Sequence, residues 1–472
     1  MLKTGTKKPV LGTGFTVLLL FVCCCLVESR YQPTWESLDT RPLPSWYDEA
    51  KIGVFMHWGP YSVPGVASEW FWFQWKRNDP NNAGDQSVVQ YMNKYYPPDF
   101  KYQEFGSQLR AEFFNATEWA DIVASSGAKY YVLTSKHHDG FSNWPSSRNF
   151  GWNSRDIGPK RDVIGELADA FRADGRVEFG LYHSLFEWFN PLYLQVETFS
   201  LFYLDWTYRI IIMFSGNYKP QVLWSDGEWE ALDTYWRSKE FLAWLYNDSP
   251  VKDTVVANDR WGRDILCKHG DFYTCTDRYN PGVLQKHKWE NAMTIDRKSW
   301  GYRRNMNLED ILTMEELTET LAMTISCGGN LLMNVGPNSQ GSIDTIFQER
   351  LRQMGDWLKV NGEAVYSSIP WTVQNDTINS KVWYTIRVDK QSGTLVYGIL
   401  LDWPLDRQVE LGSPEPTANT KISILGSNTT ISWKAKEGGG LSLELPPRDE
   451  ISSNWAWVIR LEELGNAGNN VW

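Results

Sequence analysis

The chain has 472 residues, 42 % of them hydrophobic, and a formal net charge of −11. This length exceeds one ordinary small core and suits a large domain followed by a smaller one. The negative charge argues against nucleic acid and anionic membranes as main partners, because both are negatively charged themselves. The 26 tryptophans supply flat aromatic faces that suit the C–H faces of sugar rings.

The first 29 residues have the pattern of a signal peptide. Three lysines precede an apolar run over residues 15–27, and the small residue Ser29 follows it. The run is too short to span a bilayer comfortably, so a retained anchor helix is the less favoured alternative. We therefore expect cleavage of residues 1–29, no membrane anchor, and passage through the secretory pathway to the lysosome or the extracellular space.

An oxidising route has consequences for cysteines and asparagines further along the chain. It makes a disulfide between Cys267 and Cys275 plausible and leaves Cys327 as a buried thiol. Sequons predict N-glycosylation at four asparagines, Asn115, Asn247, Asn375 and Asn428. Pro250 makes the second of these a poorer acceptor.

Short apolar runs that end abruptly in polar or aromatic residues recur from about Tyr47 to Tyr366. Continuous apolar runs are typical of strands buried on both faces of a parallel sheet. A barrel of βα units carries its functional groups at the carboxyl ends of such strands. The pattern predicts an α/β fold, with a (β/α)8-like barrel over residues 30–370. The runs do not show whether the barrel closes. Six runs fit well and the seventh fits less well: 52–56, 130–134, 178–181, 221–224, 254–257, 330–335 and 289–294.

An amphipathic helix over residues 347–359 closes this region. After Pro370 the runs become short and alternating, with Gly, Pro and Asn clusters between them, which is typical of an antiparallel β-sandwich. We therefore place a domain boundary near residue 370 and a C-terminal β-sandwich over residues 371–472. Its predicted strands are 382–388, 395–401, 422–425, 441–445 and 455–461.

Four of the six histidines stand at the ends of predicted strands: His57, His137, His138 and His183. Adjacent residues of an extended segment point opposite ways, so His137 and His138 are poorly placed to hold one metal ion together. No His-x-x-x-His or paired Cys-x-x-Cys spacing occurs. We therefore expect no metal site, and neutral imidazoles that bind hydroxyl groups, with satisfied core histidines as the alternative.

Asp226 is the first candidate for a reactive carboxylate. It follows an apolar run directly, and Gly227 beside it lets another group approach closely. The alternative role is a helix N-cap for the segment that follows. Carboxyls, imidazoles and indoles without a nucleophilic serine or cysteine motif indicate glycoside hydrolysis.

A glycosidase of this kind needs a second carboxyl as general acid, and three residues compete for that role. Glu290 stands beside Trp289, which would remove water from it and raise its pKa. Asp277 follows Cys275 closely, so a disulfide would hold its loop. Glu228 shares one side of an extended chain with Asp226.

Eight segments of the chain, in the same order, closely resemble the animal α-L-fucosidases. The resemblance extends from about Tyr31 to the C-terminal strands, which is nearly all of the expected mature chain. The segments are HWGPYSVP (57–64), SEW (68–70), SKHHDGF (135–141), GLYHS (180–184), WSDGEWE (224–230), NDRWG (258–262), HKWE (287–290) and SWGYRR (299–304).

The resemblance implies a retaining double displacement on terminal α-L-fucose of glycoproteins, glycolipids or oligosaccharides, with no metal or organic cofactor. It places the nucleophile on Asp226 and leaves Glu290 and Asp277 as the main candidates for the acid/base. It assigns sugar binding to eight residues: His57, Glu69, Trp70, His137, His138, Tyr182, Trp224 and Arg260. Fucosylated glycans are then the partners, as substrates. The resemblance leaves open whether the chain forms a homo-oligomer. A fucose-binding lectin without catalysis and a glycosidase for another sugar are the alternatives.

Two places depart from the family pattern. Ala292 stands where the family often has cysteine, two residues after the glutamate of HKWE. Relatives carry a polar amphipathic stretch over residues 195–217, whereas residues 201–214 of this chain are apolar almost all round. This stretch is either a buried helix or an error in the predicted transcript, and its abrupt limits favour the error.

Overall fold

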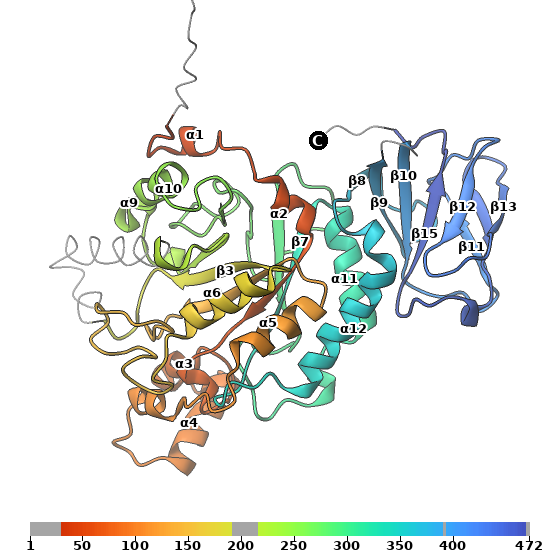
Figure 1. Cartoon of the computed structure of the whole chain (residues 1–472). Coiled ribbons are helices and arrows are strands. Elements are labelled where there is room, and N and C mark those ends of the chain that lie inside the picture. Colours follow the sequence, from red (N-terminus) through yellow and green to blue (C-terminus); the bar gives the residue numbers. More distant parts are fainter. Residues whose placement is uncertain (1–29, 191–215, 390–392, 469–472) are drawn as a thin grey trace, which may run out of the picture. The chain divides into compact units, whose positions relative to one another are not determined.

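The computed structural model describes residues 30–190, 216–389 and 393–468 (Figure 1). The expected signal peptide and residues 195–215 of the apolar stretch lie outside these ranges. Within them, we find no helix with both the length and the apolar character needed to cross a membrane.

A curled sheet of seven parallel strands forms the centre of the larger part of the chain, in the order β5-β4-β3-β2-β1-β7-β6. Nearly every strand residue is buried, which agrees with the continuous apolar runs in the sequence. All seven predicted runs are strands, including the least regular one. The strands are β1 (Ile52–Met56), β2 (Tyr130–Lys136), β3 (Glu178–Ser184), β4 (Val222–Asp226), β5 (Val256–Ala257), β6 (Trp289–Thr294) and β7 (Gly329–Val335).

Residues 271–274 bridge the two edge strands of this sheet. The amide of Asp271 donates to the last carbonyl of β5 at 3.0 Å. On the other side, Tyr273 donates to Lys288 at 2.9 Å, and the amide of Glu290 in β6 donates back to Tyr273 at 2.8 Å. A single parallel bridge at Tyr273 thus takes the place of an eighth strand. We call residues 271–274 the seam.

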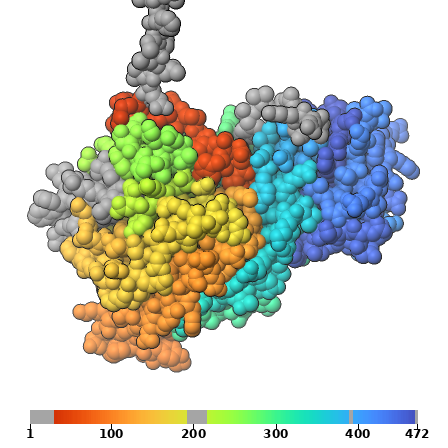
Figure 2. Space-filling model, viewed as in Figure 1, coloured from red at the N-terminus to blue at the C-terminus, as the bar shows by residue number. Residues whose placement is uncertain are grey.

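Helices between the strands cover the outside of the sheet. Figure 1 shows α5, α6 and α12 side by side, and Figure 2 shows the surface they form, from yellow through orange to cyan. The helix predicted over 347–359 is α12, and it buries the apolar face expected of it. The helices are α1 (Trp35–Leu38), α2 (Ser45–Ala50), α3 (Phe71–Arg77), α4 (Ala83–Tyr95), α5 (Ala116–Ser125), α6 (Val163–Asp174), α9 (Asp233–Trp236), α10 (Ser238–Asn247), α11 (Met314–Ser326) and α12 (Thr345–Asn361).

Two antiparallel sheets follow, with strand orders β12-β15-β10-β9-β8 and β11-β14-β13. Their side chains share one buried apolar cluster, as in a β-sandwich. Helix α11 contacts β8 and β9, and Trp357 of α12 donates to Ala456 at 2.9 Å. The strands are β8 (Ile369–Asn375), β9 (Val382–Asp389), β10 (Gly393–Leu400), β11 (Gln408–Leu411), β12 (Lys421–Ile424), β13 (Ser432–Ala435), β14 (Leu441–Glu444) and β15 (Trp457–Glu462). Sequence analysis missed β8, β11 and the mostly exposed β13.

Candidate active site

A cavity of about 160 Å³ lies where the carboxyl ends of the parallel strands meet. All eight residues expected to bind sugar line it, together with Asp226 and Asp277. The complete lining is Phe55, His57, Glu69, Trp70, His137, His138, Tyr182, Trp224, Asp226, Trp229, Arg260, Asp277 and Trp300.

Asp226 is the last residue of β4, and its carboxylate is held from both sides. Tyr182 donates to Oδ2 at 2.7 Å, and Arg260 Nη1 donates to Oδ1 at 3.0 Å. Nε2 of His138 lies 3.6 Å from Oδ2. Burial would raise the pKa of Asp226, but Arg260, His138 and Tyr182 together hold it below its usual range. The side chain is engaged by these groups rather than serving as a helix N-cap.

Gly227 lets the chain turn away directly after this carboxylate. Its φ of 83° lies in the left-handed region that glycine adopts without strain. A Cβ atom here would meet the ring of Phe186 at 2.6 Å, so any larger residue would displace that ring.

Arg260 connects two of the three carboxyls that line the cavity, those of Asp226 and Asp277. Its Nη1 bonds to Asp226, while Nη2 donates to Asp277 Oδ1 at 2.7 Å and Nε donates to Thr274 Oγ1 at 3.0 Å. The guanidinium carbon lies 4.6 Å from the ring centre of Trp224. Every part of this guanidinium is therefore fixed, and one cation spans both acids.

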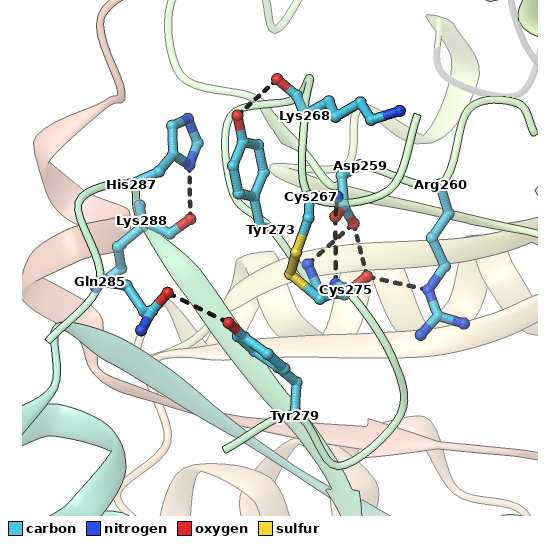
Figure 3. The surroundings of a disulfide bond; sticks show 11 residues. Asp259, Arg260, Cys267, Lys268, Tyr273, Cys275, Tyr279, Gln285, His287 and Lys288 are labelled. Atoms are coloured by element: carbon cyan, nitrogen blue, oxygen red, sulfur yellow. Dashed lines mark hydrogen bonds between the residues drawn. A yellow bond between two sulfur atoms is a disulfide. The ribbon is translucent and has the colours of Figure 1, made fainter. Parts of the chain in front are cut away.

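A disulfide supports the loop that carries Thr274 and Asp277. Cys267 and Cys275 are bonded to each other, and Asp259 accepts from both of their amides, at 2.8 and 3.2 Å. Figure 3 shows the Asp259 carboxylate beside the disulfide. Among the described residues, these three form the one cluster of potential metal ligands, and the disulfide already uses both sulfurs.

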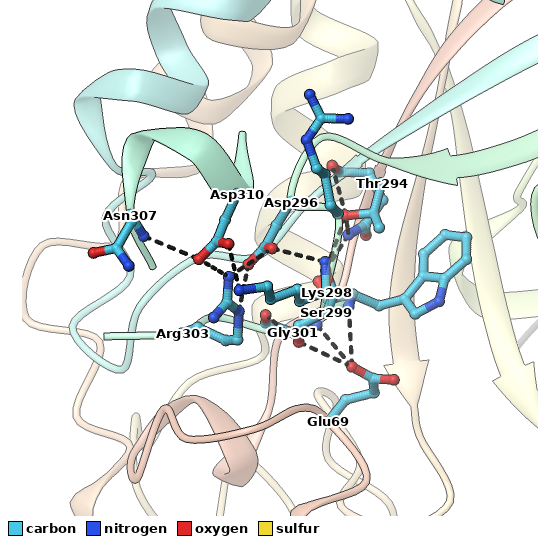
Figure 4. A network of polar contacts seen from close by, with 12 residues as sticks. Glu69, Thr294, Asp296, Lys298, Ser299, Gly301, Arg303, Asn307 and Asp310 are labelled. Atoms are coloured by element: carbon cyan, nitrogen blue, oxygen red, sulfur yellow. Dashed lines mark hydrogen bonds and ion pairs between the residues drawn. The ribbon is translucent and has the colours of Figure 1, made fainter. Parts of the chain in front are cut away.

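Glu69 is buried at another side of the cavity. Its Oε2 accepts from the amides of Trp300 and Gly301, at 3.1 and 3.0 Å, and from Ser299 Oγ at 3.3 Å. Figure 4 shows its other oxygen pointing away from these donors. Burial raises the pKa of Glu69, and the backbone amides oppose that effect.

Ion pairs hold the loop of Trp300 and Gly301 in place. Arg303 donates to both oxygens of Asp296, at 2.7 and 2.8 Å, and to Asp310 at 2.9 Å (Figure 4). The amides that donate to Glu69 therefore lie on a loop that these ion pairs stabilise.

The imidazoles of the cavity are neutral at neutral pH. Burial lowers the pKa of His57 to about 4 and that of His138 to about 4. The Nδ1 atoms are engaged with Asn334 and Ser184, each at 2.7 Å, so Nε2 is the nitrogen available to a ligand.

The expectation that His137 and His138 point opposite ways is wrong. Their ring centres lie 4.1 Å apart and both rings line the cavity. Regular pairing of β2 is interrupted between Thr134 and Lys136, so strand alternation no longer applies at these histidines. His183 does not line the cavity, because it faces the opposite side of β3 from Tyr182.

Glu290, the favoured acid in the sequence analysis, does not line the cavity. It is the second residue of β6, near the amino end of that strand, and it is 0 % exposed. Its expected neighbour Trp289 points away and donates to Cys327 at 2.9 Å. The indole that contacts Glu290 belongs instead to Trp224, at 2.9 Å.

The two rival acids differ in their access to the cavity. Asp277 lines it, and its side chain is 47 % exposed. Glu228 is buried and does not line it, and burial together with the charge of Asp226 raises the pKa of Glu228 to about 7.

Sequence analysis missed three aromatic members of the cavity, Phe55, Trp229 and Trp300. Trp229 and Trp300 lie inside the matched segments WSDGEWE and SWGYRR, which was the available signal. Trp229 is 40 % exposed, and its ring stacks near that of Trp70 with centres 6.1 Å apart.

Comparison with known proteins gives matches along almost the whole chain. The family profile described as Alpha-L-fucosidase matches residues 19–363, and the profile described as Alpha-L-fucosidase C-terminal domain matches residues 374–462. An alpha-L-fucosidase of Branchiostoma floridae is 53 % identical over 95 % of this chain and 99 % of its own. The human plasma alpha-L-fucosidase is 50 % identical over 97 % of both chains. The crystal structure of the Thermotoga maritima alpha-fucosidase in complex with fucose superposes with a TM-score of 0.76, at 32 % identity, covering 92 % of this chain and 100 % of that one.

Proposed function

The chain belongs to the alpha-L-fucosidase family and is an alpha-L-fucosidase, and we propose that it removes terminal α-L-fucose from glycans by double displacement in the cavity around Asp226. One observation carries this mechanism: Arg260 bonds at once to Asp226 and Asp277, two of the three acids that line the cavity. A lectin that only held fucose would need no such pair.

Asp226 is the nucleophile in this proposal. Its carboxylate attacks the anomeric carbon, the bond to the leaving oxygen breaks, and an ester of fucose with Asp226 forms. Arg260 and Tyr182 keep the carboxylate charged and aimed before the attack. Water then cleaves the ester and releases fucose with retained configuration.

Asp277 is the acid/base in this proposal. It gives its proton to the leaving oxygen in the first step and takes one from water in the second. Access decides between the candidates, because an acid must first reach the atom that it protonates. Asp277 lines the cavity, whereas Glu228 and Glu290 do not. A retaining enzyme needs its two carboxyls about 5–5.5 Å apart, and a guanidinium shared between them favours a short separation.

The other cavity residues bind the sugar. Glu69 accepts from a hydroxyl through its free oxygen, and the neutral rings of His57 and His138 exchange hydrogen bonds through Nε2. The aromatic faces of Trp70 and Trp300 pack against the C–H face and the methyl group of fucose. The remaining predicted binding residues, His137, Tyr182 and Trp224, complete the wall.

We also propose that the chain enters the secretory pathway and is glycosylated. A disulfide and plasma relatives support this route. Asn115 and Asn428 are exposed, as glycan acceptors must be. The amides of Asn247 and Asn375 each donate to two backbone carbonyls, so modification there would break those bonds.

Hydrolysis of a chromogenic aryl α-L-fucoside tests the proposal directly. We expect release of the phenol, with α-L-fucose as the first anomer seen by NMR. First appearance of the β anomer would disprove the double displacement. Fucose binding without release would identify a lectin.

A further inference from the structure

Glu290 lies at the meeting point of three buried donors from separate elements. Its Oε2 accepts from the hydroxyls of Tyr47 in α2 and Tyr130 in β2, each at 2.7 Å. Its Oε1 accepts from Nε1 of Trp224 in β4, at 2.9 Å. A buried carboxylate with three donors is a costly feature for a protein to keep unless the arrangement serves a purpose.

Trp224, which donates to Oε1 of Glu290, forms part of the wall of the active site. Trp224 lines the cavity, and its ring stacks on that of Tyr182, with centres 5.7 Å apart. The guanidinium carbon of Arg260 lies 4.6 Å from the ring centre, a cation–π arrangement. The indole can turn about its side-chain bonds, so the face it offers to Arg260 depends on what holds its N–H.

Arg260 in turn holds the two carboxyls of the proposed mechanism, Asp226 and Asp277. A chain of contacts therefore runs from Glu290 through Trp224 and Arg260 to the reacting groups. An error of about 1 Å in such a site costs as much as about a hundredfold in rate.

We propose that Glu290 is a positioning residue, which fixes the indole of Trp224 and through it the guanidinium that spans Asp226 and Asp277. This inference rests on the function proposed above for those two acids. Glu290 cannot exchange a proton with the leaving group from its place, because it does not line the cavity and both of its oxygens already accept from buried donors. Burial raises its pKa, while the three donors and the nearby Lys288 favour the charged form.

Variants at Glu290 test the proposal by kinetics. Glu290→Ala leaves the indole N–H without a partner, so we expect kcat to fall about tenfold to a hundredfold. The loss should be the same for a fucoside with a good leaving group and one with a poor leaving group. Glu290→Gln keeps an oxygen for the indole and should lose much less.

The pH profile of kcat/KM distinguishes a positioning role of Glu290 from a role in stability alone. A displaced Arg260 stabilises the Asp226 carboxylate less, so the pKa of Asp226 rises. The acid limb of kcat/KM should then move to higher pH in Glu290→Ala. Tyr130→Phe, which removes one donor to Glu290, should move it in the same direction. Tyr131→Phe is the matched control, because its ring stacks on Phe171 instead and the limb should stay in place.

A double-mutant cycle tests the route through Trp224. Trp224→Phe keeps a ring face for Arg260 but removes the N–H. Adding Glu290→Ala to this variant should cost at most about threefold more in kcat. Fully additive losses would overturn the proposal, as would an unmoved acid limb. A loss far larger for the poor leaving group, with azide rescue on the activated fucoside that gives a product of retained configuration, would make Glu290 the acid/base. Absence of fucosidase activity in the unaltered protein would instead overturn the proposed function.

Discussion

Tyr182 donates a hydrogen bond to Oδ2 of Asp226 across 2.7 Å, from the strand directly beside the one that ends at Asp226. The register of β3 and β4 pairs Tyr182 with Trp224, two residues before Asp226, so the long phenol reaches forward along the barrel. This bond and the Arg260 ion pair together offset the cost of burying the Asp226 charge.

Replacing the nucleophile should leave a folded protein that still binds fucose. We expect Asp226→Gly to lose about 10⁴- to 10⁶-fold in kcat, because the covalent step is removed. Added azide should restore partial turnover and give the fucosyl azide of inverted configuration. Assays with an aryl fucoside and NMR of the product check both points, and near-normal turnover would rule out the assignment.

Tyr182→Phe should change the pH dependence more than the fold. Without the phenol, the charged form of Asp226 loses one donor, so the pKa of Asp226 rises. Asp226 must be charged to attack, so activity should fail earlier as the pH is lowered. The acid limb of kcat/KM measures this shift, and a limb that moved to lower pH would contradict it.

Asp277→Ala should slow the hydrolysis of some fucosides much more than that of others. A fucoside with a poor leaving group should lose about 10²- to 10⁴-fold, because its departure requires protonation, while an activated aryl fucoside should react far better. Azide should rescue the variant and give a product of retained configuration. Glu228→Gln is the comparison, since the same leaving-group pattern in that variant would transfer the role to Glu228.

Removing the disulfide should affect both stability and catalysis. Cys267→Ser with Cys275→Ser opens a loop with a sequence separation of 8, which costs about 2–3 kcal/mol in the chain-entropy description. Thr274 lies inside this loop and Asp277 follows it by two residues. Both are bonded to Arg260, so kcat should fall as well. Thermal unfolding and aryl fucoside kinetics measure the two effects. A variant with lower stability but unchanged kcat would show that the loop keeps its place without the bond.

Strand positions could be predicted because most of the runs are largely apolar and end abruptly in polar or aromatic residues. The seam could not, because residues 271–274 contain only one bridging residue and carry no apolar run. β13 is mostly exposed, so its sequence lacks the alternation that reveals a half-buried strand.

The expectation that Trp289 encloses Glu290 is wrong, for a reason that strand geometry explains. Trp289 is its neighbour in sequence, but neighbours on a strand point to opposite sides, so Trp289 could not enclose it. Glu290 also stands near the start of β6, whereas functional groups of such barrels lie at strand ends. Asp226, at the end of β4, satisfies that rule.

The seam determines where the barrel opens most readily. Only a few backbone hydrogen bonds join it to β5 and β6, whereas full ladders join the central strands. Local unfolding begins where such bonds are fewest, so the amides of Tyr273 and Glu290 should exchange with solvent before those of β1 and β2. Local opening of the barrel then starts beside the loop that carries Asp277. The backbone hydrogen bonds at the catalytic face break first, while those in the opposite half of the sheet stay formed.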